Sequence, residues 1–238
     1  SVGSVYGGCN KSDAVIYNEE GDSNLHPNTT VKAGLVLNLD YPDFSAANVF
    51  GGCRMGNVHT RKIEDGKPVN VMLANNQYGT IIKVRAGKYG RIFGGNDVSG
   101  RIYNGTHVLL EGGEINEVFG AGNGEYIYQY SPDVKEITEC YDPDAKMYYY
   151  KIPASPDYEG AYANDFQKMQ AITAARPNII KTLVEISGGM RDGKRQIVKV
   201  NDAIYGGGNC ATVYSNKQHG RITLQIGDYC SIENLYLG

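Results

Sequence analysis

The feature that most constrains the fold of this chain is a short motif that recurs along its 238 residues. The motif runs Val/Ile, Phe/Tyr, Gly and Gly/Ala, and it is most often followed after one residue by Asn. Complete copies begin at Val5, Val49, Ile92, Val118 and Ile204. Residues 235–238 form a degraded sixth copy. Because such repetition indicates one structural unit built several times, it is the strongest guide to the architecture.

Alternating apolar and polar residues precede each copy of the motif after the first. These stretches cover residues 35–39, 81–85, 108–111, 183–187 and 222–226. A period of two is typical of a β-strand with one buried face. A further short element precedes some of these strands, at residues 77–81 and 218–222. Since no helical pattern separates the strands, the sequence argues against a Rossmann or barrel fold.

The strands and motifs together predict an all-β fold, a parallel β-helix in which each repeat forms one coil. The shortest interval between motif aromatics, 26 residues from Phe93 to Phe119, is close to the length of a single coil. Longer intervals are interpreted as a coil plus insertions, which solenoids place in loops. We therefore expect one solenoid domain over residues 1–238, part of a longer chain, with insertions at about 55–78 and 126–180.

Stacked coils would place equivalent side chains in ladders along the axis. The motif aromatics would form one ladder, made of Tyr6, Phe50, Phe93, Phe119, Tyr205 and Tyr236. The glycines beside them are expected to let the backbone turn. Asn10, Asn123 and Asn209 follow the glycines, where Asn tolerates a corner and can bond along the stack. These residues are interpreted as builders of the fold rather than of a site.

Five cysteines leave at least one thiol unpaired within a monomer. Cys9 and Cys53 both directly follow Gly-Gly in their repeats. Adjacent coils would hold them about 4.8 Å apart, a spacing that a disulfide can span. The alternative, which the sequence favours, is a ladder of two small buried thiols. No Cys-x-x-Cys pair occurs, so a structural zinc site is not expected.

The repeated V-[FY]-G-G-x-N unit, with I-x-x-V-[FY] leading into it, resembles the glycine-rich repeats of large secreted or surface proteins of Bacteroidetes. In general form it is also similar to right-handed parallel β-helix proteins of the pectin-lyase-like kind. The resemblance covers residues 1–54, 79–125 and 181–238, and it implies a right-handed solenoid at an extracellular or outer-surface location. Such helices serve as adhesins, phage tailspikes and carbohydrate enzymes alike, so it does not select a function.

Composition excludes some partners. The net charge is only −3 and the Lys and Arg residues are scattered, so no nucleic-acid partner is expected. No run of about 18 apolar residues occurs, and the chain is therefore not expected to span a membrane. The sequence opens almost directly on a repeat, without a charged and apolar leader, so it is interpreted as a mature or excised piece of something longer.

The segment from about 126 to 181 departs furthest from the repeat. Nine of the nineteen tyrosines lie between residues 126 and 162. Tyrosine beside acidic groups suits sugar or peptide recognition, because the ring offers apolar area plus a hydroxyl. The candidate ligand-binding residues are Tyr126, Tyr128, Tyr130, Tyr148, Tyr149, Tyr150, Asp142 and Asp144. The alternative is that these tyrosines attach a hairpin to the flank of the coils.

Local patterns predict some structure inside the two insertions. Alternating tyrosines on both sides of residues 142–145, which contain Pro-Asp, predict a β-hairpin. Residues 161–176 are a helix candidate, with apolar residues at helical spacing and Pro177 after them. The mixed-charge stretch at residues 61–68 in the shorter insertion is interpreted as the solvated tip of a hairpin.

No catalytic residue and no cofactor is predicted. Polygalacturonase-like β-helices carry Asn-x-Asp, Asp-Asp, Gly-His-Gly and Arg-x-Lys motifs, and only the first is matched, at residues 38–40. Calcium is kept as an alternative, since it prefers oxygen ligands. Its candidate ligands are Asp133, Asp142, Asp144 and Asp157. The histidines lack metal-binding spacing and are interpreted as turn or surface residues: His26, His59, His107 and His219.

The sequence therefore favours a non-catalytic extracellular or cell-surface β-solenoid, adhesin-like, that presents the Tyr-rich acidic insertion for glycan or protein binding. The expected partners are a glycan, a surface protein, other domains of the same chain or a surface complex. The alternative is a β-helix polysaccharide lyase or glycoside hydrolase with an incomplete site in these residues, so enzymatic activity is left open. Two carboxylates about 5–9 Å apart in a cleft would favour that alternative.

Overall fold

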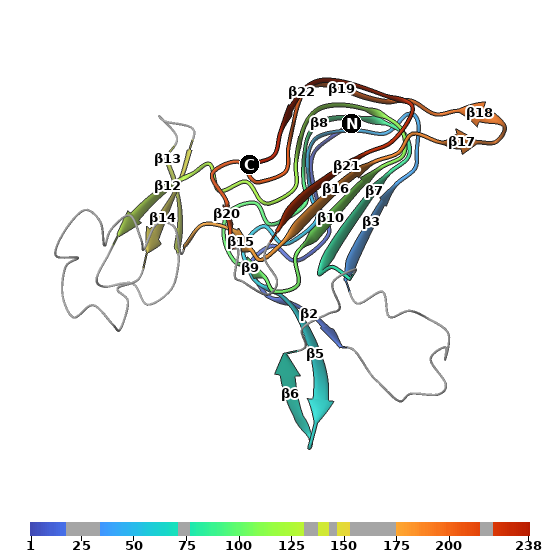
Figure 1. The fold of residues 1–238 in the computed structure, drawn as a ribbon. Helices are drawn as coiled ribbons and strands as arrows, with labels where there is room; N and C mark the ends of the chain where they lie inside the picture. The colour runs from blue at the N-terminus through green and yellow to red at the C-terminus, as the bar shows by residue number, and fades with distance from the viewer. Residues whose placement is uncertain (18–33, 71–76, 131–137, 143–146, 153–174, 215–220) are drawn as a thin grey trace.

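A computed structural model describes residues 1–17, 34–70, 77–130, 138–142, 147–152, 175–214 and 221–238. Within these residues the chain is all-β, with almost no helix. Three parallel sheets form the body, and the chain visits them in the same order in every repeat (Figure 1). The predicted all-β class is confirmed, and the stacked parallel sheets are compatible with a β-solenoid.

The three sheets are named here by their strands, in spatial order. Sheet A contains β1 (Val2–Tyr6), β4 (Ser45–Phe50), β8 (Lys88–Phe93), β11 (Glu114–Phe119), β19 (Val198–Tyr205) and β22 (Cys230–Tyr236). Sheet B contains β2 (Ala14–Tyr17), β5 (Val58–Glu64), β9 (Arg101–Ile102), β15 (Asn178–Ile179) and β20 (Thr212–Val213). Sheet C contains β3 (Leu35–Leu39), β7 (Thr80–Val84), β10 (Thr106–Leu110), β16 (Thr182–Ile186) and β21 (Ile222–Ile226).

The chain runs from sheet A through sheet B to sheet C and then returns to sheet A one strand further along. We call each such round a coil. Sheet C keeps one register throughout its five strands, and its strands match the five predicted stretches to within two residues. The predicted further element at 77–81 was placed wrongly, and most of the one predicted at 218–222 lies outside the described residues. The third sheet instead follows the motif, as β9 shows, and Thr80 already belongs to β7.

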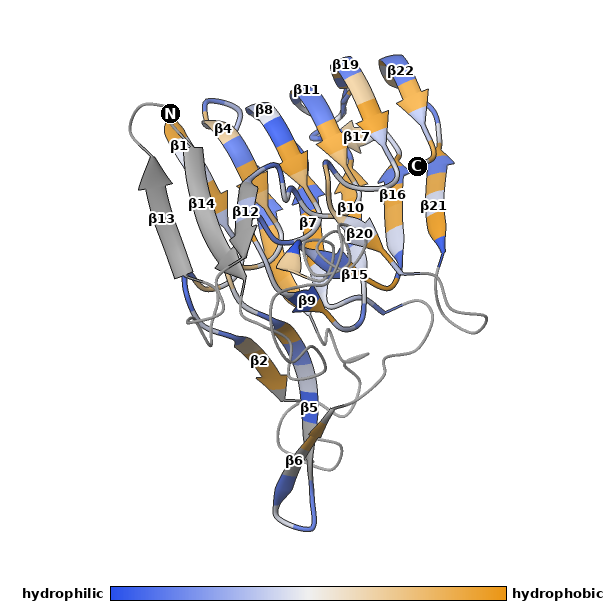
Figure 2. Cartoon of the chain, turned by 90° about the vertical axis from the view of Figure 1, so that its left-hand side faces the viewer, coloured by the Kyte–Doolittle hydropathy of each residue, from blue (hydrophilic) through white to orange (hydrophobic). Residues whose placement is uncertain are grey.

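The alternating pattern of the strands places one side of each strand in the core. Ile82 and Val108 on sheet C pack with Val49 and Ile92 on sheet A in one cluster, and all four are fully buried. Figure 2 shows the apolar segments side by side along the sheets. Because burial of such a side chain contributes about 1.5–3 kcal/mol, this interior supplies the main stabilisation of the coils.

The predicted ladder of motif aromatics is confirmed. From Tyr6 to Tyr236, neighbouring rings stack with centroids 4.7 to 5.0 Å apart and interplanar angles of 6 to 10°. The phenylalanines in the middle of the ladder are buried, whereas Tyr236 is 47% exposed. The predicted asparagine contact is also present, since Asn209 Nδ2 donates to Asn123 Oδ1 at 3.1 Å.

The motif glycines have a different role from the one predicted. They do not adopt positive φ; the positive-φ glycines lie elsewhere, for example at Gly87 and Gly105. Instead, a Cβ added at Gly51 would collide with the carbonyl oxygen of Gly94, and a Cβ at Gly94 would collide with that of Gly120. Glycine is therefore required because the backbones of adjacent coils approach each other closely at this point.

Threonine hydroxyls at the start of the sheet C strands bind these same glycine carbonyls. Thr80 donates to Gly94 O, and Thr106 donates to the equivalent Gly120 O, in both cases across 14 residues. Thr182 makes the equivalent bond across 24 residues. The longer separation shows that the coil containing Thr182 holds an extra loop of about one hairpin's length.

In the part of the chain that the structure describes, three departures from the regular coils lie on different sides of the stack (Figure 1). One is the antiparallel hairpin of β5 with β6 (Lys67–Asn70), which confirms the hairpin predicted at 61–68. The second is a three-stranded sheet of β12 (Ile127–Tyr130), β14 (Met147–Ile152) and β13 (Thr138–Asp142). Antiparallel pairing of β13 with β14 confirms the predicted hairpin around 142–145. The helix predicted at 161–176 lies almost wholly outside the described residues.

The third departure, the hairpin of β17 (Met190–Arg191) and β18 (Lys194–Arg195), was not predicted.

Replacing Gly94 with Ala should lower the free energy of unfolding by about 1–3 kcal/mol, the usual cost of overpacking. The added methyl group would displace the neighbouring coil at the carbonyl of Gly120. Chemical denaturation followed by circular dichroism measures the change. Gly3→Ala is the matched control, because a Cβ at Gly3 has no atom within 4 Å. Equal loss of stability in both variants would contradict the proposed contact.

Candidate functional site

The candidate site lies at the corner where sheet C ends and the chain turns back to sheet A. The residues directly after the sheet C strands occupy equivalent positions on successive coils. Along the stack they are Asp40, Arg85, Glu111, Ser187 and Gly227. The first three alternate in charge on coils about 4.8 Å apart. This corner therefore carries a short row of negative, positive and negative groups.

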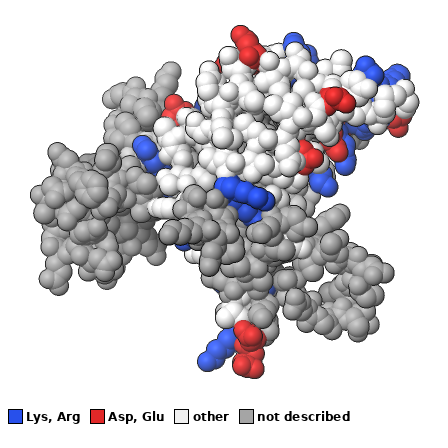
Figure 3. All heavy atoms as spheres, in the orientation of Figure 1, with Lys and Arg blue, Asp and Glu red and all other residues white. Residues whose placement is uncertain are grey.

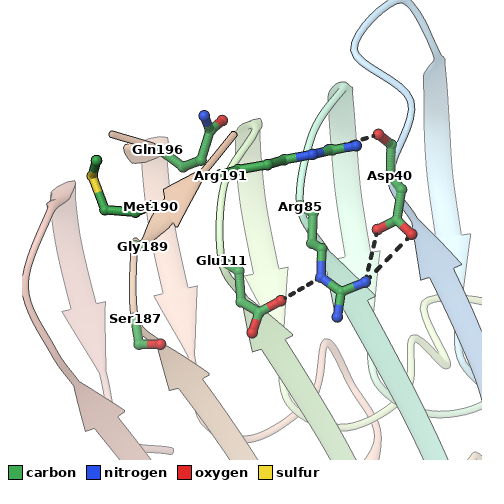
Figure 4. A pocket seen from close by; sticks show the side chains of 9 residues that line it. Asp40, Arg85, Glu111, Ser187, Gly189, Met190, Arg191 and Gln196 are labelled. Carbon is green, nitrogen blue, oxygen red and sulfur yellow. Dashed lines mark hydrogen bonds and ion pairs between the residues drawn. The ribbon is translucent and has the colours of Figure 1, made fainter. Parts of the chain in front are cut away.

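Arg85 joins the two carboxylates of this row (Figure 4). Its Nε donates to Glu111 Oε2 at 2.7 Å, and its Nη1 donates to both carboxylate oxygens of Asp40 at 3.4 Å. The hydrogen bond and the charge of Glu111, followed by the charge of Asp40, raise the pKa of Arg85. The three side chains are 33 to 40% exposed, so solvent screens the pairs, and each contributes at most about 1 kcal/mol.

The hairpin β17–β18 forms one wall of a cleft over this row. Its turn holds Asp192 at φ 50° and Gly193 at φ 73°, the backbone of a tight two-residue hairpin turn. Arg191 extends from the hairpin across the row, and its Nη1 donates to the backbone oxygen of Asp40 at 3.0 Å (Figure 4). The cleft encloses about 410 Å³. Its lining consists of Asp40, Arg85, Glu111, Ser187, Gly188, Gly189, Met190, Arg191 and Gln196.

A second hollow of about 790 Å³ is also lined by Arg191. Here the hydrogen bonds from Asn201 and Lys199, together with the charges of Lys199 and Lys88, lower the pKa of Glu114 to about 2. Asn201 Nδ2 and Lys199 Nζ lie 3.2 and 3.1 Å from Glu114 Oε1. Figure 3 shows charged groups of both signs around the hairpin and this end of the molecule. The two hollows thus form a polar, mixed-charge surface.

The chemistry of the cleft suits hydrogen bonding. Arg85 donates to carboxylate oxygens of both Asp40 and Glu111, so a guanidinium already engages each carboxylate. Both carboxylates and both arginines remain accessible at the surface of the cleft. They offer donors and acceptors of the kind that bind hydroxyl-rich or peptide ligands.

The candidate ligand residue Tyr126 belongs to a different cluster, centred on the buried carboxylate of Asp97. Tyr126 Oη donates to Asp97 Oδ1 at 2.6 Å, and Tyr6 Oη donates to Oδ2 at 2.8 Å. Asn123 Nδ2 adds a third bond at 2.9 Å. Burial and the adjacent carboxylate of Asp97 raise the pKa of Tyr6 above its ordinary value. The cluster borders a small hollow of about 210 Å³ that also contacts Arg54.

Tyr128, the second candidate ligand residue, is buried and fastens the Tyr-rich sheet to the coils. Its hydroxyl donates to the backbone oxygen of Val98 at 2.6 Å, and the guanidinium of Arg176 lies 5.6 Å from its ring centroid. Burial raises the pKa of Tyr128. Tyr126 and Tyr128 therefore contact the body of the protein, as the alternative interpretation of the tyrosines expects.

The remaining candidate residues lie on the strands of the Tyr-rich sheet or outside the described residues. Tyr130 is on β12, Asp142 on β13, and Tyr148, Tyr149 and Tyr150 on β14. In the backbone register, Tyr150 pairs with Tyr128 and Tyr148 pairs with Tyr141. The side chains of these strand residues, and all of Asp144, fall outside what the structure describes.

Three of the four candidate calcium ligands, Asp133, Asp144 and Asp157, lie outside the described residues, as does the side chain of Asp142. The calcium site therefore stays a prediction. Among the described residues, no group of three or more His, Cys, Asp or Glu could hold a metal ion. Two histidines are not turn or surface residues, contrary to the prediction, and His26 and His219 lie outside the described residues. His59 is buried on β5 with Nε2 3.0 Å from Asp13 Oδ2, and His107 on β10 has Nε2 3.2 Å from Glu185 Oε2.

The residues of the cleft were not predicted as a site, although two signals in the sequence point to it. Asp192-Gly193 between short flanking strands is typical of a hairpin turn. Aligning the sheet C strands also places Asp40, Arg85 and Glu111 in one column. The contact between Arg191 and Asp40 spans 151 residues and has no local signal in the sequence.

Comparison with known proteins adds no relative: no family model, no curated protein and no solved structure matches this chain. In the part of the chain that the structure describes, no helix has the length and apolar character needed to cross a membrane.

Lys199→Met should raise the pKa of Glu114 from about 2 toward its ordinary value of 4.5, because it removes a hydrogen bond and the nearest charge. Carbon-13 NMR titration of the glutamate carboxyls measures this pKa. Lys88→Met is the matched control and should shift it less, because Lys88 Nζ lies farther away, at 3.5 Å. Since the folded pKa is depressed, this interaction stabilises the fold above pH 4.5 and is lost as the pH falls toward 2. An unchanged pKa in Lys199→Met would contradict the assignment.

Proposed function

We propose that this chain is a right-handed parallel β-helix that serves recognition rather than catalysis. In this proposal it is an extracellular or cell-surface module of adhesin type, similar to the glycine-repeat surface proteins of Bacteroidetes, and the Tyr-rich insertion binds a glycan or a protein. Support for the fold comes from the repeated order of sheets A, B and C, since parallel crossover connections are almost always right-handed.

The observation that carries the proposal is the way the Tyr-rich sheet is attached. Tyr126 and Tyr128 bond to consecutive residues, Asp97 and Val98, of the corner after β8. Arg176 holds the same ring of Tyr128 from the other end of the insertion. Two hydroxyl hydrogen bonds, one buried and one part-buried, and a cation–π contact restrain both ends of the insertion. Such preorganisation lowers the entropic cost of binding a ligand. In Figure 1 this sheet lies beside the stack rather than covering it.

A β-helix polysaccharide lyase or hydrolase with an incomplete site is the second candidate. It is favoured by one observation, that Asp40 of the Asn-x-Asp match and Glu111 line the same cleft. Against it, Arg85 donates hydrogen bonds to both carboxylates, so both are already engaged within the protein. Recognition is therefore the function that the described residues support best.

Deletion of residues 131–174, replaced by a short Gly-Ser linker, should abolish binding on an array of glycans and extracellular-matrix proteins. The deletion keeps Tyr126 and Tyr128, so the coils retain their contacts at Asp97 and Val98. Circular dichroism and thermal unfolding of the variant confirm that the body is folded. Equal binding by the intact chain and the variant would overturn the role of the insertion.

Arg85→Met separates the two candidate functions on the same array. If the insertion binds the ligand, this variant should keep its affinity to within about threefold, as expected of a residue outside the contact. Lys67→Met, an exposed charge on the β5–β6 hairpin, is the matched control. Loss of binding in Arg85→Met alone would move the site to the cleft. Release of reducing ends or unsaturated sugars from a bound glycan, lost in Glu111→Gln, would establish the enzyme instead.

A further inference from the structure

Cys9 and Cys53 occupy the same position in the first and second coils. The backbone N–H of Arg54 donates to the carbonyl of Cys9 at 2.9 Å, which fixes the register of the two coils at this point. Each sulfur lies near the carbonyl oxygen four residues further on, Cys9 Sγ at 3.8 Å from Asp13 O and Cys53 Sγ at 4.0 Å from Asn57 O. The two side chains are therefore arranged alike, one coil apart.

The sulfur of Cys53 faces the first coil. The backbone N–H of Cys9 donates to Cys53 Sγ at 3.3 Å. A Cβ on Gly8 would lie 2.7 Å from the same sulfur, so glycine at this position leaves the sulfur its space against the first coil. Cys53 is completely buried and Cys9 is half-buried, and both are free thiols. Among the described cysteines, Cys9 is the one whose backbone contacts the sulfur of Cys53, directly across the coil boundary.

We propose that Cys9 and Cys53 form an oxidisable pair whose disulfide joins the first coil to the second. Adjacent parallel strands hold equivalent Cα atoms about 4.8 Å apart, inside the range of about 4.4–6.8 Å that disulfides span. Rotation about the Cα–Cβ bond of Cys9 brings its sulfur toward Cys53. The first coil can also adjust, since three of the five residues of β1 are exposed and β4 is its one described neighbour in sheet A.

The oxidant is a small-molecule disulfide such as oxidised glutathione. The thiolate of the more accessible Cys9 attacks it, which forms a mixed disulfide and releases one glutathione thiolate. The sulfur of Cys53, after losing its proton to water, attacks the Cys9 sulfur and releases the second glutathione. The protein loses two protons and two electrons, and one oxidised glutathione becomes two reduced molecules. Burial raises the pKa of the Cys53 thiol, so the second step is the slower one at neutral pH.

The disulfide would fasten the end of the stack. The two residues are 44 positions apart, so the bond closes a long loop in the unfolded chain and stabilises the folded coil. The first coil also supplies Tyr6, one of the three donors to Asp97, so the oxidised pair secures the cluster that Tyr126 joins.

The test uses the intact, reduced chain, incubated with oxidised glutathione, alkylated and digested without reduction. Mass spectrometry should find a peptide pair linked through Cys9 and Cys53, and thiol titration of the unfolded chain should fall from five thiols to three. Dithiothreitol should restore all five. Amide hydrogen exchange of β1 should become slower in the oxidised protein.

The exposed Cys210 serves as an internal control for the oxidant, because a glutathione adduct at this residue shows that the oxidant was active. Before thiol titration, brief treatment with glutaredoxin and reduced glutathione, which supplies the electrons, removes such adducts. Cys210→Ser should leave the linked peptide unchanged, and Cys9→Ser should abolish it. The proposal is overturned if Cys9 carries glutathione while Cys53 is alkylated, if either residue is linked to another cysteine, or if Cys210 reacts and both thiols of the pair stay free.

Discussion

The backbone of each coil approaches the next so closely at the motif glycines that a carbonyl oxygen occupies the space of a Cβ atom. The contact recurs from Gly7 against Gly51 to Gly120 against Gly206. Threonine hydroxyls bind several of these same carbonyls and hold the sheet C strands to the glycine corner. The aromatic ladder and the apolar core depend on this spacing, because rings stack at 4.7 to 5.0 Å only when successive backbones lie equally close.

Strict stacking also determines where chemistry can occur. Each corner brings one residue from every coil into a row, so charges far apart in the sequence become neighbours. At the corner after sheet C this produces the row of Asp40, Arg85 and Glu111, in which one guanidinium pairs with two carboxylates. At the corner after β8 it produces the buried Asp97 that accepts hydrogen bonds from Tyr6 and Tyr126. The regular coils thus supply hydrogen-bonded polar groups at their corners, and the Tyr-rich sheet attaches to Asp97 through Tyr126.

Much of the body could be predicted because its signals are local. Period-two alternation identified the sheet C strands, and the recurring aromatic identified the ladder of rings. The role of the glycines was misjudged, because a positive-φ turn and a close backbone contact require the same residue. The hairpin β17–β18 was not predicted. Thr182 lies 24 residues before the glycine that it binds, whereas Thr80 lies 14 residues before its own, and the 10 additional residues accommodate the hairpin.

By itself the sequence determined that this is an all-β repeat protein, which residues alternate into its core and where the repeat is interrupted. Those properties follow from periodicity, which each strand expresses independently of the others. Only the tertiary structure decided that Arg191 reaches Asp40 across 151 residues, that Arg85 pairs with two carboxylates and that Cys53 directs its sulfur toward Cys9. Such contacts depend on which coils are adjacent and on how each corner turns, and no single segment of the chain encodes either.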